Sequence, residues 1–362
     1  MTKVSKEESL EQSKRAYAMW GDLWRRNSQI NGTLPKIMMD ELRYKGIGKV
    51  ALCIATGPSL DKHIDTIIKY RNKIDIICVD KSFGILMDRG IIPDFVFVAD
   101  AKISYENYCE KWISYTKDIC LISNVCTNPN WGINWLGPKT YYVNKDNIES
   151  EKEFGSISGI NDCIPAGSNV SNSLIVYASS VLKYDKYILC GYDFSFDIGG
   201  NFYSDDNHHV KNFYLNQIRM MDIHGRLAST SHNLSFSCRW LFEWVTKAIG
   251  ANKVINASEK GILNLPLLGR LKDQLQAIPC YKRELTQKEL ALVMNKKMVV
   301  QDEHSFNKAK ELMSNENALI NECVIHYQMK EDGNYAKLQF SRDLQEDKKL
   351  REKNLISTGA LN

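Results

Sequence analysis

Short apolar runs alternate with amphipathic stretches between residues 48 and 280 of the chain. The runs have the length and composition of buried β-strands, and they cover Val50–Ala55, Ile74–Val79, Phe95–Ala99, Ile119–Ser123, Tyr141–Val143 and Tyr187–Cys190. Runs that are apolar throughout suit a parallel sheet covered on both faces, and alternation of strands with helices favours the same arrangement. The pattern therefore predicts an α/β fold: a Rossmann-like, mostly parallel sheet with helices on both faces.

Both ends of the chain have a helical pattern instead. Residues 1–47 carry apolar and aromatic side chains at helical spacing, with Trp20 and Trp24 on one face. Residues 281–362 are rich in Lys and Glu, with sparse apolar positions. We therefore expect an N-terminal helical segment at 1–47, a Rossmann-like nucleotide-binding and transferase domain at 48–280, and a charged C-terminal helical extension at 281–362. The helical extensions are suited to forming a homo-oligomer or to binding a partner.

Composition and charge narrow the classes of ligand. With 44% hydrophobic and 25% charged residues, the chain has the composition of a folded protein rather than a disordered one. The formal charge of +4 is spread along the chain, so we expect no nucleic-acid-binding surface, whereas anionic small molecules fit. No apolar run approaches the roughly 18 residues that a membrane span needs. Several cysteines lie inside the apolar runs, as in proteins of a reducing compartment, so we expect a cytoplasmic protein.

The loop Thr56-Gly57-Pro58-Ser59-Leu60, which follows the first strand, is the strongest chemical signal. Gly57 permits a tight turn, Pro58 suits a helix start, and Ser59 can cap the helix. The free amides of the first helical turn would then attract a phosphate group. The same residues also suit a Gly-Pro turn that only caps a helix, and spacing alone does not decide between the two. Gly57, Pro58 and Ser59 are therefore candidate phosphate-binding residues.

Polar residues follow other strands at the edge where α/β proteins bind ligands. Asp80 is placed to accept a hydrogen bond from a ribose or sugar hydroxyl, or to cap the next helix. Asp100 has the same options and is also suited to a divalent cation. Gly167 and Ser168 open a helix, either as a second anion site or as an ordinary cap. Asp193 ends another strand, where it would bind a ligand or hold a neighbouring turn through backbone amides.

The runs ALCIATGPSLDKHI and IICVDKSFGILMDRGIIPDFVFVAD resemble the MptE-like family. That family includes archaeal hydroxymethyldihydropterin pyrophosphokinases and the Maf (motility accessory factor) proteins, which glycosylate flagellin with nonulosonic acids. The matching elements are the loop at Gly57–Leu60, the turn at Gly90–Asp94 and the strand-ending Asp100. The run AGSNVSNSLIVYASSVLKYDKYILCGYDFSF is similar to the family's second signature, a Gly-Ser helix start followed by a strand ending in Gly-x-Asp. The resemblance covers roughly residues 48–265 and implies a nucleotide-dependent transferase.

A shorter likeness connects the chain with bacterial sialyltransferases that use CMP-sialic acid. The shared elements are the GPSL loop, Ser123-Asn124, Gly167-Ser168 and Gly191–Phe194. This resemblance implies that Asn124 and Asp193 contact the nucleotide and that Tyr203 approaches its phosphate. It also implies a histidine general base in a loop of this region.

Three histidines are candidates for that base, because imidazole titrates near neutrality. His208 and His209 follow the acidic loop at 204–206, and His232 precedes a long predicted helix at 233–249. The resemblance does not choose among them, and each is equally consistent with a solvated surface histidine. The spacing of Asp205, Asp206 and these two neighbouring histidines matches no standard metal site, so we assign none.

The resemblance favours glycosyl transfer: movement of an acidic sugar from a CMP-activated donor to a hydroxyl acceptor on a protein or glycan. We expect this reaction to need no cofactor. The rival is ATP-dependent pyrophosphoryl transfer to a hydroxymethylpterin-like alcohol, which would need Mg²⁺, with Asp100 and Asp193 as its carboxylates. A third hypothesis is a non-catalytic module that binds a nucleotide or recruits a partner.

Overall fold

The computed structural model describes residues 6–145, 148–165, 167, 169–197, 203–204 and 217–279. Met1–Asp302 forms one compact unit, to which all these residues belong, and Glu303–Asn362 forms a second. The helical extension predicted at 281–362 lies outside the described residues, so its structure stays a prediction.

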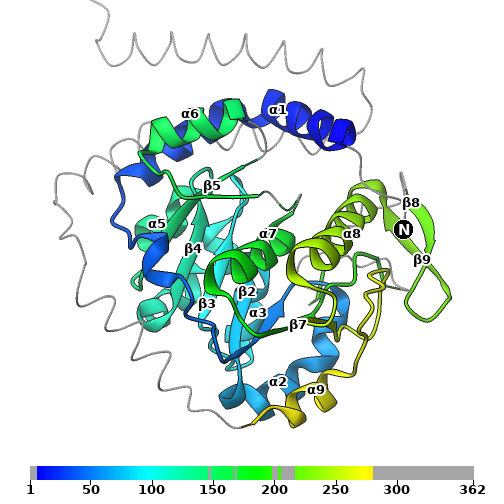
Figure 1. The fold of residues 1–362 in the computed structure, drawn as a ribbon. Coiled ribbons are helices and arrows are strands. Elements are labelled where there is room, and N and C mark those ends of the chain that lie inside the picture. The colour runs from blue at the N-terminus through cyan, green and yellow to red at the C-terminus, as the bar shows by residue number, and fades with distance from the viewer. Residues whose placement is uncertain are drawn as a thin grey trace, which may run out of the picture. The chain divides into compact units, whose positions relative to one another are not determined.

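The strands form one large sheet and a separate hairpin (Figure 1). The large sheet has eight strands in the order β10-β7-β1-β2-β3-β4-β5-β6, and every neighbouring pair is parallel. Its strands are β1 (Val50–Ile54), β2 (Asp75–Val79), β3 (Phe95–Val98), β4 (Cys120–Asn124), β5 (Lys139–Asn144), β6 (Cys163–Ile164), β7 (Lys186–Cys190) and β10 (Val254–Asn256). The hairpin pairs β8 (Gln217–Met221) with β9 (Leu227–Ser231) in antiparallel register.

Helices cover both faces of the sheet. They are α1 (Lys6–Thr33), α2 (Ile64–Tyr70), α3 (Asp80–Asp88), α4 (Tyr105–Tyr108), α5 (Pro129–Asn134), α6 (Ile148–Ser158), α7 (Val170–Tyr177), α8 (His232–Trp244) and α9 (Leu271–Ala277). Short 3-10 helices lie at Met39–Leu42, Pro58–His63, Arg71–Lys73 and Glu110–Asp118, and π-helical turns continue α7 over Ala178–Leu182 and α8 over Val245–Ile249. The predicted Rossmann-like fold class is therefore confirmed.

Alternation along each strand explains the two layers. In β1, Ala51 and Cys53 face the cluster that contains the core residues of α7 and α8. Leu52 and Ile54 face the opposite cluster, to which α2, α3 and α9 contribute. Because both faces are buried, the strand is apolar throughout, as its sequence indicated.

The order of the strands creates a switch point beside β1. The chain adds β2 to β6 on one side of β1 and then returns to place β7 on the other side. Crossovers that leave β1 and β7 in opposite directions open a crevice at the carboxyl ends of the two strands, and ligands of such sheets bind there.

Buried amides attach the N-terminal helix α1 to the sheet domain. Asn31 donates through Nδ2 to the carbonyl oxygens of Val125 and Thr127, each at 2.8 Å. Asn27 donates through Nδ2 to the carbonyl oxygen of Cys126 at 2.9 Å. Polar side chains on the buried side of α1 therefore pair with the carbonyl groups of the turn after β4.

Two elements escaped prediction from the sequence. Strand β6 has only two residues. In the hairpin, β8 alternates exposed and half-buried positions, β9 buries only Thr230, and neither strand is an apolar run. Neither has the continuous apolar pattern by which the other strands were found.

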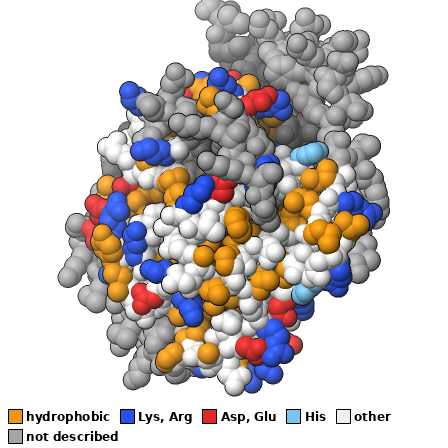
Figure 2. Space-filling view, turned by 45° about the vertical axis from the view of Figure 1, so that its right-hand side comes forward, with side chains coloured by type: hydrophobic (Ala, Val, Ile, Leu, Met, Phe, Trp, Pro, Cys, Tyr) orange, Lys and Arg blue, Asp and Glu red, His pale blue; other side chains and the backbone are white. Residues whose placement is uncertain are grey.

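Charged side chains, which are spread along the sequence, are also spread over the part of the surface that the structure describes. On the face that Figure 2 shows, basic, acidic and hydrophobic side chains are interspersed among the described residues. Within the same residues, no helix has the length and apolar character that crossing a membrane requires.

We predict that Asp94, in the turn that resembles the MptE-like family, stabilises the fold. Its Oδ2 accepts hydrogen bonds from Ile76 N and from Arg71 Nη2, both at 2.7 Å, and its side chain is buried. Asp94→Ala should lower the free energy of unfolding by about 3–5 kcal/mol, because it leaves a mostly buried guanidinium without its carboxylate. Asp88→Ala removes only an exposed ion pair with Lys111 and should cost below about 1 kcal/mol. Equal losses in urea denaturation would contradict this assignment.

Candidate functional site

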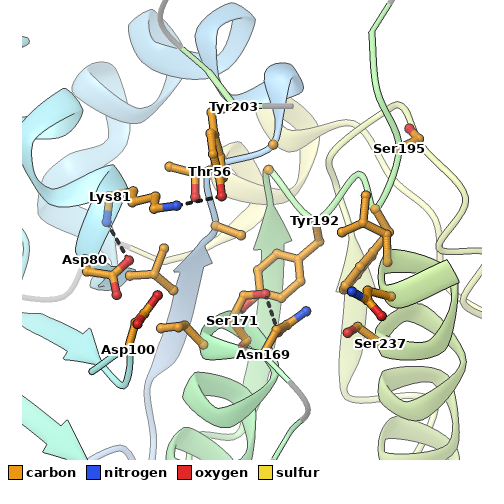
Figure 3. A pocket seen from close by; sticks show the side chains of 18 residues that line it. Thr56, Asp80, Lys81, Asp100, Asn169, Ser171, Tyr192, Ser195, Tyr203 and Ser237 are labelled. Carbon is orange, nitrogen blue, oxygen red and sulfur yellow. Dashed lines mark hydrogen bonds between the residues drawn. The ribbon is translucent and has the colours of Figure 1, made fainter. Parts of the chain in front are cut away.

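A pocket of about 310 Å³ lies at the predicted edge of the sheet, over the ends of β1, β2, β3 and β7 (Figure 3). The starts of α7 and α8 complete its wall. One side of the pocket is charged and hydroxyl-rich, with Thr56, Asp80, Lys81, Asp100 and Tyr203. The other side is polar and uncharged, with Asn169, Ser171, Ser195, Asn233 and Ser237. This division suits a ligand with one anionic and one neutral polar part.

Only the first residues of the loop Thr56–Leu60 line the pocket. Thr56 and Gly57 line the pocket, whereas Pro58 and Ser59 do not. Pro58 begins a helix as predicted, but the first turns are a 3-10 helix and α2 starts at Ile64. Ser204 N donates to Thr56 O at 2.8 Å, which holds the neighbouring Tyr203 beside the loop.

Asp193 occupies the position at which we expected a phosphate group. Ser59 N donates to Asp193 Oδ2 at 2.7 Å, and Ser59 Oγ donates to Asp193 Oδ1. Gly57 N donates to Gly191 O at 2.9 Å, and Leu60 N donates to Gly57 O at 3.0 Å. The amides of this turn therefore have acceptors within the chain, and Asp193 holds a neighbouring turn, the alternative role that its position allowed.

Burial raises the pKa of the Asp193 carboxyl to about 6, although both hydrogen bonds from Ser59 favour its charged form. Asp193 is 1% exposed and does not line the pocket. A direct contact of this carboxylate with a nucleotide or a metal ion, as the resemblance implied, is not available in this arrangement.

Two glycines allow the strand ends to approach this closely. A Cβ atom on Gly57 would lie 2.5 Å from Gly191 O and 2.8 Å from Asp193 Cγ. Gly191 has φ +74°, and a Cβ atom there would lie 2.4 Å from Ala55 O. Gly57 is therefore required by close packing against β7, while Gly191 is required by both packing and backbone conformation.

Asp80 lies at the start of α3, where one carboxylate oxygen accepts a backbone hydrogen bond and the other has no partner among the described residues. It is the first residue of α3, and its Oδ1 accepts a hydrogen bond from Lys81 N at 2.7 Å. Its Oδ2 is buried and has no hydrogen-bond partner among the described residues. Burial raises the pKa of Asp80 to about 7, and the nearby charge of Asp100 adds to this effect. Figure 3 shows the two carboxyl groups turned toward each other in the pocket.

Lys81 is the residue that sequence reasoning missed. Its Nζ donates to Tyr203 Oη at 2.6 Å and lies over the Tyr203 ring, 4.0 Å from the ring centroid. Burial opposes its charge, but Tyr203 and Asp80 together raise the pKa of Lys81 above its ordinary value. A half-buried ammonium group in the pocket wall is suited to binding an anion. Its place directly after a strand-ending Asp was the available signal.

The second helix start reaches the pocket through Asn169 and Ser171 instead of Gly167. Asn169 caps α7: its Oδ1 accepts from Asn172 N at 2.8 Å and from Ser171 Oγ at 3.0 Å. Gly167 N donates to Ser173 Oγ at 3.2 Å, and Gly167 does not line the pocket. Ser168 lies outside the described residues. The cap is thus established, and a contact of Gly167 with a ligand is not.

Asn124 lies at the end of β4, away from this pocket. Its Oδ1 accepts a hydrogen bond from Cys126 N at 2.8 Å, so the side chain forms the turn that leaves the strand. It does not line the pocket, and the nucleotide contact implied by the resemblance is not formed there. Tyr203, by contrast, lies in the pocket wall, and its approach to a phosphate group stays a prediction.

Among the three candidate bases, only His232 belongs to the described residues, and it does not line the pocket. His208 and His209 lie outside the described residues. His232 is the exposed first residue of α8 and does not line the pocket, although its neighbour Asn233 does. The part of the chain that the structure describes also contains no group of three or more His, Cys, Asp or Glu side chains placed to hold a metal ion.

Comparison with known proteins shows which family and which structures this chain resembles. The strand order and the pocket are those of a Rossmann-like α/β protein with a pocket at the switch point of its sheet. Residues 29–199 match the family described as 6-hydroxymethylpterin diphosphokinase MptE-like. The resemblance to the MptE-like family is thereby confirmed over the segment that carries the GPSL loop and Asp193.

Two individual proteins are also similar. An uncharacterized protein of Treponema pallidum (strain Nichols) is 31% identical over 90 residues, which are 25% of this chain and 43% of that protein. The structure of a MAf glycosyltransferase from Magnetospirillum magneticum AMB-1 superposes with a TM-score of 0.57 and 16% identity, over 76% of this chain and 42% of the other. Each match covers less than half of the other protein, and the second one establishes the fold.

We predict that Gly57→Ala lowers stability, because the new methyl group would press against the Gly191 carbonyl oxygen and the Asp193 side chain. The expected loss is about 1–3 kcal/mol, the usual cost of overpacking. Gly21→Ala in α1 meets only ordinary contacts with Tyr17 and should not lower stability. Denaturation midpoints compare the two variants, and a Gly57→Ala protein as stable as wild type would contradict the tight packing.

We predict a pH-dependent gain in stability for Asp80→Asn. The folded protein holds the Asp80 proton up to about pH 7, whereas the unfolded chain releases it near the ordinary value of 3.8. The wild type therefore loses stability as pH rises between these values, and the neutral amide does not. The melting-temperature advantage of Asp80→Asn should grow from about pH 4 to pH 7 and then level off. Asp88→Asn on the same helix is the exposed control, and parallel curves for both variants would contradict the burial effect.

Proposed function

We propose that this protein is a nucleotide-dependent glycosyltransferase that moves an acidic sugar from a CMP-activated donor to a hydroxyl acceptor. The observation that carries the proposal is the half-buried Lys81 ammonium group in a pocket at the switch point of the sheet. It stands beside the hydroxyl groups of Thr56 and Tyr203.

The charged side of the pocket fits the phosphate of the donor. During glycosyl transfer, negative charge grows on the phosphate oxygen that leaves the sugar. Lys81 Nζ and the hydroxyl group of Tyr203 are held together at 2.6 Å and would stabilise that charge. Because both groups are already positioned by the fold, little reorganisation is needed during the reaction.

The uncharged side of the pocket fits a base or a sugar. Asn169, Ser171, Asn233 and Ser237 offer amide and hydroxyl groups over the side chains of Tyr192 and Phe194. Polar groups around an apolar floor are the usual composition of small-molecule sites, and the volume of about 310 Å³ lies within their size range.

The comparisons support a transferase-like protein at a coarser level. The family description names a diphosphokinase, and the structure with the same fold is titled a glycosyltransferase. The CMP-linked acidic sugar and the independence from metal go beyond these comparisons and rest on the sequence resemblance and the pocket.

Ligand binding tests the proposal. Thermal shifts are measured with CMP, CDP, UDP, GDP, AMP and ATP, each with and without Mg²⁺. CMP should stabilise the protein most, and without Mg²⁺. Preference for ATP with Mg²⁺ would instead favour pyrophosphoryl transfer, and no shift with any nucleotide would favour a module that recruits a partner.

A variant pair locates the binding site. Lys81→Met keeps the apolar stem but removes the charge, and should weaken CMP binding by about tenfold to a hundredfold, the value of a hydrogen bond to a charged group. Lys62→Met, on the exposed side of the same region, should leave CMP affinity unchanged. Equal affinities for both variants in calorimetric titrations would exclude Lys81 as the phosphate ligand.

A further inference from the structure

We propose that Asp80 accepts the proton of the acceptor hydroxyl through its Oδ2 atom. This inference rests on the proposed glycosyl transfer and adds the group that performs the proton transfer.

The geometry of the carboxylate carries the inference. Oδ1 is used by Lys81 N, which fixes the orientation of the group at the start of α3. Oδ2 has no hydrogen-bond partner among the described residues, although Asp80 is only 3% exposed and lines the pocket. A buried oxygen acceptor without a partner is costly unless a ligand supplies the donor. A hydroxyl group is the donor that a neutral acceptor substrate would bring.

The other acidic groups near the pocket are less suited to this task. Asp100 is exposed, and its Oδ1 accepts a hydrogen bond from Lys102 N at 2.9 Å. Both carboxylate oxygens of Asp193 accept hydrogen bonds from Ser59. Asp80 is the acid in the pocket wall that is both buried and left with an open acceptor.

The described histidines near the pocket also do not fit. His63 is buried against Ser258 O, with 3.2 Å between its Nε2 and that oxygen, and it does not line the pocket. His232 is exposed and outside the wall.

The charges around Asp80 adjust its basicity. Lys81, the next residue of α3, and Asp100, in the loop after β3, act on Asp80 directly. Cys78 of β2 and Tyr108 of α4 also interact with its charge, and Tyr203 contacts Lys81. Burial and Asp100 raise the pKa of Asp80 to about 7, while Lys81 opposes the shift. A base with a pKa near the working pH is efficient, because it is available in its charged form and still binds a proton well.

The proposed step balances as follows in atoms and charge. The acceptor oxygen uses a lone pair to form a bond with the anomeric carbon of the sugar. The bond between that carbon and the donor phosphate oxygen breaks, and its electron pair leaves with CMP. The hydroxyl proton moves to Asp80 Oδ2 and is released to water after the products depart. Lys81, the next residue along α3, faces the departing phosphate, so consecutive residues serve the two ends of the reaction.

Hydrolysis of the donor tests this role without a known acceptor, because water can replace the acceptor hydroxyl. The probe is a CMP-linked nine-carbon acidic sugar, and CMP release is measured with the full-length chain. Asp80→Asn keeps the oxygen that accepts from Lys81 N but cannot take a proton. It should lower kcat by about 10²–10⁴-fold, the usual contribution of a general base. CMP affinity and KM should change less than about threefold.

The pH profile separates proton transfer from a structural effect. Wild-type kcat should rise with pH and level off above about pH 7, as Asp80 loses its proton. Asp80→Asn should lack this dependence. Asp100→Asn should move the rising limb to lower pH, because the anion that raises the pKa of Asp80 is removed. Asp88→Asn, an exposed residue at the far end of α3, should reproduce the wild-type profile.

The results distinguish a failure of the role assigned to Asp80 from a failure of the proposed glycosyl transfer. If the wild type hydrolyses the donor and Asp80→Asn keeps its kcat and pH profile, the role of Asp80 is wrong and glycosyl transfer stands. A parallel loss of CMP affinity and kcat in Asp80→Asn would show that Asp80 binds the donor, which also overturns the inference. If the wild type neither binds CMP nor hydrolyses the donor, the proposed function itself fails. If Asp80→Asn melts below wild type, the inference is tested instead by comparing the pH profiles of kcat for wild type and Asp100→Asn. A rising limb at the same pH in both proteins would contradict the inference.

Discussion

The hydrogen-bonded pair of Asp193 and Ser59 joins the carboxyl ends of β1 and β7, and the pocket depends on it. One buried carboxylate accepts from both the amide and the hydroxyl group of Ser59. This bond holds the loop after β1 against the loop after β7, at the point where crossovers diverge and the sheet would otherwise open. Gly57 and Gly191 lack side chains at this contact, since any Cβ atom would separate the two loops.

Asp193 and Asp80, two buried acidic residues at this edge of the sheet, differ in how their carboxylate oxygens are used. Asp193 fills the anion position at the helix start with a side chain of the protein itself, so the turn is complete without a ligand. Asp80 uses only one oxygen within the chain and presents the pocket with an unsatisfied acceptor beside the ammonium group of Lys81. A rigid loop on one side and an incomplete hydrogen-bond set on the other are what a pre-organised binding site requires.

The sequence predicted the sheet well because a strand buried on both faces has an unmistakable apolar pattern. The six predicted strands all formed, and the edge at which Asp80 and Asp100 meet followed from strand direction alone. The direction of the side chains did not follow from it. Asn124 ends β4 and Asp193 follows β7, yet Asn124 accepts from a backbone amide of its own turn and Asp193 from one of the neighbouring loop. Strand-end position fixes the edge of the sheet, whereas the local turn decides whether a side chain reaches the ligand.

A crystal structure of the complex with CMP tests the central claim most directly, namely that the crevice between β1 and β7 is the nucleotide site. The account predicts the phosphate within hydrogen-bonding distance of Lys81 Nζ and Tyr203 Oη, with the Asp193–Ser59 bonds intact and the base against the uncharged side of the pocket. A phosphate bound to the amides of Ser59 and Leu60, with Asp193 displaced, or a nucleotide bound elsewhere on the protein, would contradict it.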